Sequence, residues 1–173
     1  MAPWATWIIE PDRVELACPA GGQRPLTSAE IALASSMFAS AIDYAKVTVR
    51  RRKWFALQPV RTVMAPCGHL HFHPDADCYR DDFGHASLAF QGLFIHEMTH
   101  VWQAQSKGRF YLPLHRHPLC RYDYALRPGW DLARYGLEQQ AEIVRHAFLL
   151  ERGEIVPGAP GLDAYRAILP FLR

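Results

Sequence analysis

The sequence has 173 residues, of which half are hydrophobic and about a fifth are charged, and its formal net charge is +2 at pH 7. This size and composition predict one domain, 1–173, built around a single core. The small net charge gives no indication of a nucleic-acid partner, and no apolar run reaches the ~18 residues that a membrane span needs.

Residues 1–25 are expected to form an irregular arm, because they contain four prolines and the pair Gly21 and Gly22. The arm's large apolar side chains are expected to pack on the domain: Trp4, Trp7, Ile8 and Ile9. The first residues, MAPWATWIIEPDR, lack the basic leader and unbroken apolar region of a signal peptide. We therefore expect synthesis in the cytosol and, if the protein is exported, a route without a cleaved signal peptide.

Residues 26–47 predict the first helix. Thr27 can cap it, and Glu30, three residues later, can complete a capping box. Apolar residues then recur at spacings of three and four residues, which is the helical pattern.

Three short strands are expected next. Val47 and Val49 alternate with polar residues, and residues 60–65 (VRTVMA) are a second candidate. In the third, HLHFHP (69–74), Leu70 and Phe72 would face one side of the strand. The other side would carry three histidines, His69, His71 and His73.

Further helices are predicted at 87–106, closed by Gly108, at 137–152, closed by Gly153, and at 162–169. The proline- and aromatic-rich connection 109–136 is long for a loop without structure, and such loops tend to be functional. The order of elements predicts an α+β fold in which a small antiparallel sheet packs against helices.

The segment LFIHEMTHVWQ (93–103) carries the main functional signal. His96 and His100 are one helical turn apart, so both imidazoles can reach one metal ion. Zn²⁺ suits such a pair. Glu97 lies about 100° around the helix from His96, so it can act on a water molecule as a general base. The neighbouring residues are uncharged, as a buried metal-binding helix requires.

A catalytic zinc normally has three protein ligands, and the helix containing YGLEQQAEIVRH supplies candidates. Glu138 and Glu142 are one turn apart, so both can face the first helix. One of them would bind the ion, and the other would accept the N–H of a ligating histidine. Their spacing alone leaves open which residue has which role.

HExxH followed by a helix with two acids four residues apart resembles the gluzincin branch of the zincin metallopeptidases. That resemblance implies a zincin-like fold, Glu138 as the third ligand and Glu142 as the partner of a ligating histidine. Glu142 replaces the aspartate of the family pattern. More narrowly, LFIHEMTHVWQ with EQQAEIV is similar to small bacterial zincin-like proteins labelled Vgr-related or Rhs-related, over residues 60–150. Those labels imply an association with a secretion spike.

These observations predict a zinc-dependent peptidase acting on a peptide or a peptidoglycan-type polymer. Tyr122, Tyr124, His115 and His117, in the long connection, are candidates to stabilise the oxyanion. The alternative is a non-catalytic zinc-binding adaptor or cargo module of a secretion or phage-like apparatus. A redox or metal-storage protein is a third hypothesis, which would use the histidine strand and the cysteines.

Other polar groups favour structural roles. Four scattered cysteines, without a CxxC pair, predict free thiols, with a bridge between Cys67 and Cys78 as the alternative. The basic run 50–53 has no interleaved aromatic residues, so it predicts a solvated strand end. The acidic turn at 75–82 lacks the spacing of a calcium loop.

Overall fold

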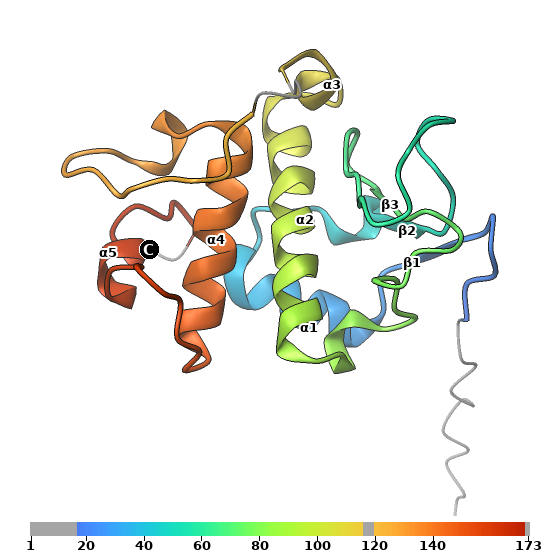
Figure 1. The fold of residues 1–173 in the computed structure, drawn as a ribbon, viewed down its shortest axis with the longest axis horizontal. Helices are drawn as coiled ribbons and strands as arrows, with labels where there is room; N and C mark the ends of the chain where they lie inside the picture. Colours follow the sequence, from blue (N-terminus) through green and yellow to red (C-terminus); the bar gives the residue numbers. More distant parts are fainter. Residues whose placement is uncertain (1–16, 116–119, 172–173) are drawn as a thin grey trace, which may run out of the picture.

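A long central helix, α2 (Leu88–Lys107), organises the fold in the computed structural model, which describes residues 17–115 and 120–171. A small sheet lies on one side of α2, and α4 (Leu137–Glu151) followed by α5 (Leu162–Arg166) lies on the other (Figure 1). The middle of α2 is buried nearly all the way round, as expected for a helix with neighbours on both sides. The predicted packing of Trp4, Trp7, Ile8 and Ile9 falls outside the described residues.

Helix α1 (Ser28–Phe38) begins where the sequence predicts, and its capping box between Thr27 and Glu30 is confirmed. It ends at Phe38, so the prediction of a helix to residue 47 was wrong. Ala39 has φ 46°, and its N–H donates to the carbonyl of Ser35. The chain then turns, places Ile42 in the core and forms a short 3₁₀ helix, η1 (Tyr44–Lys46).

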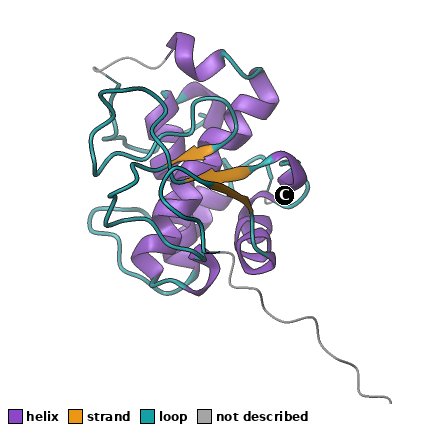
Figure 2. Cartoon of the chain, turned by 90° about the vertical axis from the view of Figure 1, so that its right-hand side faces the viewer, coloured by secondary structure: helices purple, strands orange, loops and turns teal. Residues whose placement is uncertain are grey.

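The small sheet, orange in Figure 2, contains β1 (Gln23–Pro25), β2 (Thr48–Arg50) and β3 (Leu70–His71). Its strand order is β1-β2-β3. β1 pairs with β2 antiparallel, but β2 pairs with β3 parallel, so the prediction of an antiparallel sheet was wrong. Residues 23–25, predicted as part of an irregular arm, form its outer strand. The predicted strand 60–65 is reduced to one bridge, between Met64 and His71.

The alternation predicted for β3 holds only in part. Leu70 and Phe72 are buried, but His71 and His73 are buried as well, so this strand has no exposed histidine face. Phe72 continues into a stack of aromatic rings through Phe83 in η2 (Phe83–His85) to Phe94 in α2, with ring centroids 5.4 Å apart at each step. This stack joins the sheet to the central helix.

The predicted ends of α2 and α4 are confirmed. Gly108 and Gly153 follow the two helices with φ of 101° and 79°, values that glycine adopts without a steric penalty. The connection between the two helices contains α3 (Tyr111–His115) and η3 (Leu132–Arg134). Helix α5 ends at Arg166, whereas the sequence predicted an end at residue 169.

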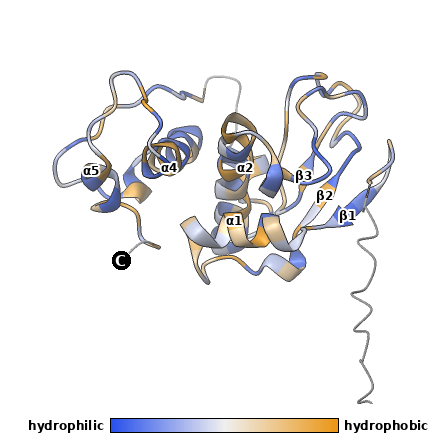
Figure 3. Cartoon of the chain, turned by 90° about the horizontal axis from the view of Figure 1, so that it is seen from below, coloured by the Kyte–Doolittle hydropathy of each residue, from blue (hydrophilic) through white to orange (hydrophobic). Residues whose placement is uncertain are grey.

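Many of the hydrophobic residues coloured in Figure 3 belong to α1, α2 and α4, and these three helices contribute Phe38, Met98 and Phe148 to the core. Burial of these apolar side chains provides most of the driving force for folding. No helix among the described residues is both long and apolar enough to cross a bilayer.

Candidate metal centre

The two helices that carry the predicted ligands lie side by side (Figure 1). His96 and His100 sit one turn apart on the face of α2 that meets α4, with ring centroids 5.0 Å apart. They are 7% and 1% exposed, so neither imidazole is a surface group. A buried pair of histidines on one helix face needs a partner from the facing helix.

Glu138, in the first turn of α4, supplies that partner. Its Oε2 lies 3.4 Å from Nε2 of His96 and 3.2 Å from Nε2 of His100. The three residues offer ligand atoms that all lie within 4.8 Å of one another, and they form the only such group of histidine, cysteine and acidic residues in the described part of the chain. The structure thus brings together the two histidines of the HExxH segment and the glutamate that the gluzincin resemblance implies as the third ligand.

His100 is held from behind by Gln103. Its Nδ1 lies 2.8 Å from Oε1 of Gln103, whose amide nitrogen donates to the carbonyl of Leu137 and to Oε1 of Gln140. Because those two contacts fix the amide orientation, Oε1 must accept and Nδ1 of His100 must carry the proton. In the neutral imidazole the lone pair is then on Nε2, which faces Oε2 of Glu138.

His96 is held by Glu142, with Nδ1 2.8 Å from Oε1. The distance is short, although the angle falls outside hydrogen-bond geometry, so we describe the contact as an ion pair. Burial favours the neutral imidazole, but the contacts to Glu138 and Glu142 outweigh it and raise the pKa of His96 to about 9. Burial would raise the pKa of Glu142, but the contact to His96 dominates and lowers it to about 2.

Glu97 is buried next to the two histidines, with 5% of its surface exposed. Its Oε2 has no hydrogen-bond partner among the described residues. A buried carboxylate oxygen without a donor is costly, so this position is suited to a water molecule, a substrate or an ion that supplies the missing contact.

Known proteins match this chain over most of its length, although no family model does. The chain is 41% identical over 133 residues to the type VI secretion system spike protein VgrG2b of Pseudomonas aeruginosa, a match covering 73% of this chain and 13% of that protein. The solved effector domain of Pseudomonas aeruginosa VgrG2b superposes with a TM-score of 0.69 at 35% identity, covering 91% of this chain and 88% of that domain.

The chain belongs to the VgrG2b effector-domain family. The predicted relation to secretion-spike proteins is therefore confirmed. The mixed α+β architecture is also shared, because the superposition covers nearly the whole of both chains. The chain corresponds to a small part of the full-length spike protein.

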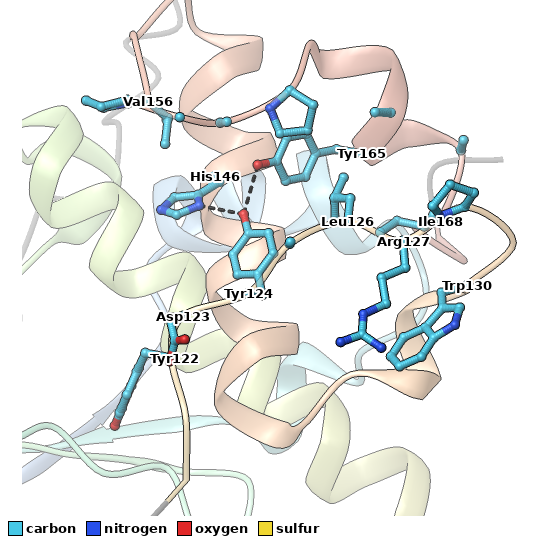
Figure 4. Close-up of a pocket in the computed structure, with 18 of the residues that line it drawn as sticks. Tyr122, Asp123, Tyr124, Leu126, Arg127, Trp130, His146, Val156, Tyr165 and Ile168 are labelled. Carbon is cyan, nitrogen blue, oxygen red and sulfur yellow. Dashed lines mark hydrogen bonds between the residues drawn. The ribbon is translucent and has the colours of Figure 1, made fainter.

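In this member of the VgrG2b effector-domain family, the residues predicted to stabilise the oxyanion lie in different surroundings. The Tyr122 ring is half-exposed and lies nearly parallel to the His96 ring, with centroids 6.3 Å apart. Tyr124 points the other way, and its hydroxyl contacts His146 and Tyr165 (Figure 4). His115 contacts the carbonyl of Tyr111, and His117 lies outside the described residues.

The histidine strand does not form a second metal cluster in the described part of the chain. His69 contacts the hydroxyl of Thr48, His71 contacts the carbonyl of Arg52, and His73 accepts the N–H of Asp75. Met64 occupies the outer edge of β3 at His71 through two backbone hydrogen bonds, which closes that point to an added peptide strand.

The other polar groups considered in the sequence are the cysteines, the basic run 50–53 and the acidic turn 75–82. Cys18, Cys67 and Cys78 are free thiols, so the alternative Cys67–Cys78 bridge is not formed. In the basic run, Arg51 donates to the carbonyls of Cys18 and Pro74. In the acidic turn, Asp82 accepts from Gly84 and Thr27.

Sequence reasoning missed two residues of the site, Gln103 and His146. Both carried a usable signal: Gln103 follows His100 by three residues, and His146 follows Glu142 by four, so each shares a helix face with a predicted site residue.

Proposed function

We propose that this member of the VgrG2b effector-domain family is a zinc-dependent peptidase. The observation that carries the proposal is the convergence of His96, His100 and Glu138 from two helices, with the carboxylate of Glu97 buried beside them. Two imidazoles and one carboxylate are a ligand set that catalytic zinc uses, with a fourth position left for water.

The residues fit a zinc ion in chemistry and in spacing. The 3.2 and 3.4 Å separations between the histidines and Glu138 are close to the roughly 3.4 Å that separates two ligands on a tetrahedral zinc. Gln103 and Glu142 fix the two rings from behind, as the outer partners of zinc-binding histidines do.

Zinc in this position would acidify a water molecule and polarise the carbonyl under attack. The chain's own residues supply the remaining steps. Glu97 takes the proton from the attacking water and later delivers it to the leaving amine. The unpartnered Oε2 of Glu97 supports this role, because a general base needs a free lone pair facing the site. Tyr122, beside His96, can donate its hydroxyl to the developing oxyanion.

The substrate that we propose is a peptide or a peptide-containing polymer, with the stem peptides of peptidoglycan as one candidate. Membership in a family whose solved member is the effector domain of a secretion-spike protein supports this choice. The same association supports export without a cleaved signal peptide.

The test combines metal analysis with hydrolysis of a peptide library. Wild type is expected to contain one zinc per chain and His100→Ala none. Glu97→Gln, which keeps the shape of the side chain and removes the base, is expected to keep zinc and lose chelator-sensitive hydrolysis. Equal hydrolysis by Glu97→Gln and wild type would contradict the mechanism. Stoichiometric zinc without hydrolysis in wild type would instead favour the non-catalytic adaptor.

A further inference from the structure

A row of polar side chains extends from the candidate metal centre to a cavity on the far side of α4. Glu142 contacts His96 through Oε1 at 2.8 Å and His146 through Oε2 at 3.3 Å. Nδ1 of His146 lies 2.6 Å from the hydroxyl of Tyr124, which lies 2.8 Å from that of Tyr165. The last three residues line a cavity of about 810 Å³ (Figure 4).

The donors and acceptors in this row can be assigned from the protonation of each side chain. Burial raises the pKa of both tyrosines, and burial lowers the pKa of His146, so the phenols keep their protons and the imidazole is neutral. Tyr165 then donates to Tyr124, and Tyr124 donates to Nδ1 of His146. The proton of His146 must therefore lie on Nε2, which faces Oε2 of Glu142 at 3.3 Å.

We propose that Tyr124 and His146 are positioning residues for the metal centre: they hold Glu142 so that its other oxygen faces Nδ1 of His96. The inference rests on the proposed zinc site. When an ion binds, Nε2 of His96 releases its proton and the remaining proton stays on Nδ1, the nitrogen that faces Glu142. A reversed row would turn a lone pair of His146, in place of an N–H, towards the carboxylate of Glu142.

Arg145 also donates two hydrogen bonds to Glu142, at 3.2 and 3.4 Å. Its side chain is 36% exposed and reaches both carboxylate oxygens, whereas His146 faces only Oε2. His146 is in turn held by Tyr124 from the connection 120–131 and, through it, by Tyr165 of α5. The row thus ties the orientation of a metal ligand to parts of the fold beyond α2 and α4.

The test measures metal binding, so it does not depend on a known substrate. Zinc affinity is measured by competition with a chromophoric chelator, and the visible absorption spectrum of the Co²⁺-loaded protein reports ligand geometry. The variants are Tyr124→Phe, His146→Ala and His146→Gln. Tyr44→Phe is the matched control, because it removes a tyrosine hydroxyl that donates to the carbonyl of Ala39 at 2.8 Å, away from the site.

We expect His146→Ala to weaken zinc binding about tenfold, at the lower end of the range for outer partners of metal ligands. Tyr124→Phe should weaken it about 2- to 10-fold, the value of one hydrogen bond. Both should change the Co²⁺ spectrum. His146→Gln should recover affinity and spectrum, since its amide can donate to Glu142 and accept from Tyr124. Tyr44→Phe should match wild type.

Wild-type affinity and spectrum in both Tyr124→Phe and His146→Ala would overturn the inference, provided that wild type binds one zinc and His96→Ala does not. If wild type itself binds no zinc, the proposed function fails first and the inference fails with it. Thermal unfolding of each metal-free variant separates loss of binding from loss of fold.

Discussion

The two histidines of the candidate metal centre are oriented by different chemistry. His100 faces the neutral amide of Gln103, and His96 faces the anionic Glu142. A carboxylate makes the opposite nitrogen of an imidazole a stronger electron donor than an amide does. The two ligands are therefore expected to differ in basicity, with His96 the stronger donor to the ion.

At the residue scale, Gln103→Leu tests the support of His100. The change removes the partner of Nδ1 of His100 and of the amide oxygen of Gln140, and one hydrogen bond to the carbonyl of Leu137. We expect unfolding to require about 1–3 kcal/mol less free energy and zinc affinity to fall by about 10- to 100-fold. Urea denaturation and chelator competition measure these effects.

Gln105→Leu is the matched control for that variant. Gln105 lies on the same helix, but it is exposed and its side chain hydrogen-bonds to the backbone of Asp43, away from the site. Zinc affinity should be unchanged in this variant. A similar loss of affinity in both glutamine variants would show that Gln103 acts through helix stability and not through His100.

At the scale of elements, the sequence predicts the helix bounds that local residue patterns set, but not the pairing of distant strands. The bounds of α2 and α4 follow from apolar spacing and closing glycines, and those two helices carry all the predicted metal ligands. Pairing within the sheet depends on contacts far apart in sequence, so the parallel β2–β3 pair could not be read from either strand. The early end of α1 has the same origin, since Ile42 turns into the core beyond Ala39.

At the candidate metal centre, too, the sequence predicts what depends on local spacing and not what depends on packing. The HExxH spacing predicts the two histidines, but only the packing of α4 on α2 decides between Glu138 and Glu142 as the residue nearest both Nε2 atoms. Tyr122 and Tyr124 are equivalent in sequence, and in a regular strand residues two apart would share a face. Their rings point in different directions (Figure 4), because residues 122–124 belong to an irregular part of the connection whose backbone the sequence pattern does not determine.

An element-scale prediction concerns Glu30, which joins β1, α1 and η2. Its carboxylate is fully buried, pairs with Arg24 through two hydrogen bonds and accepts the N–H of Phe83. Glu30→Ala leaves Arg24 as a buried charge without its partner, so unfolding should require about 3–5 kcal/mol less free energy. Chemical denaturation of the metal-free protein measures this change.

The control is Asp43→Ala, which removes a salt bridge to Lys46 between exposed side chains. Exposed pairs contribute little to stability, so this variant should unfold like wild type. Equal stability of Glu30→Ala and Asp43→Ala would contradict the role assigned to the buried pair.

At the scale of the whole molecule, His71 makes stability depend on pH. Burial, together with the nearby charges of Arg50, His69 and Arg52, lowers the pKa of His71 from 6.5 to about 4, although the contact to the carbonyl of Arg52 opposes the shift. Between those values the unfolded chain binds a proton that the folded chain does not. The contribution of His71 to the free energy of unfolding is therefore fully present above pH 6.5. It decreases as the pH falls towards 4, by up to about 3 kcal/mol.

His71→Phe tests this pH dependence, since phenylalanine keeps a ring against Trp54 and cannot titrate. The free energy of unfolding, measured by urea denaturation from pH 7 to pH 4, should fall less steeply in the variant than in wild type. Comparison of the two proteins cancels the contribution of the carboxylates. Parallel curves would show that His71 is not the titrating group.

X-ray absorption at the zinc edge tests the central claim most directly, because it reports the atoms around the ion without a substrate. We predict nitrogen and oxygen neighbours at about 2.0–2.1 Å, including the outer-shell scattering of two imidazoles. In Glu138→Ala and His100→Ala that pattern should be lost. Sulfur at about 2.3 Å would assign the ion to the cysteines and would contradict a centre formed by His96, His100 and Glu138.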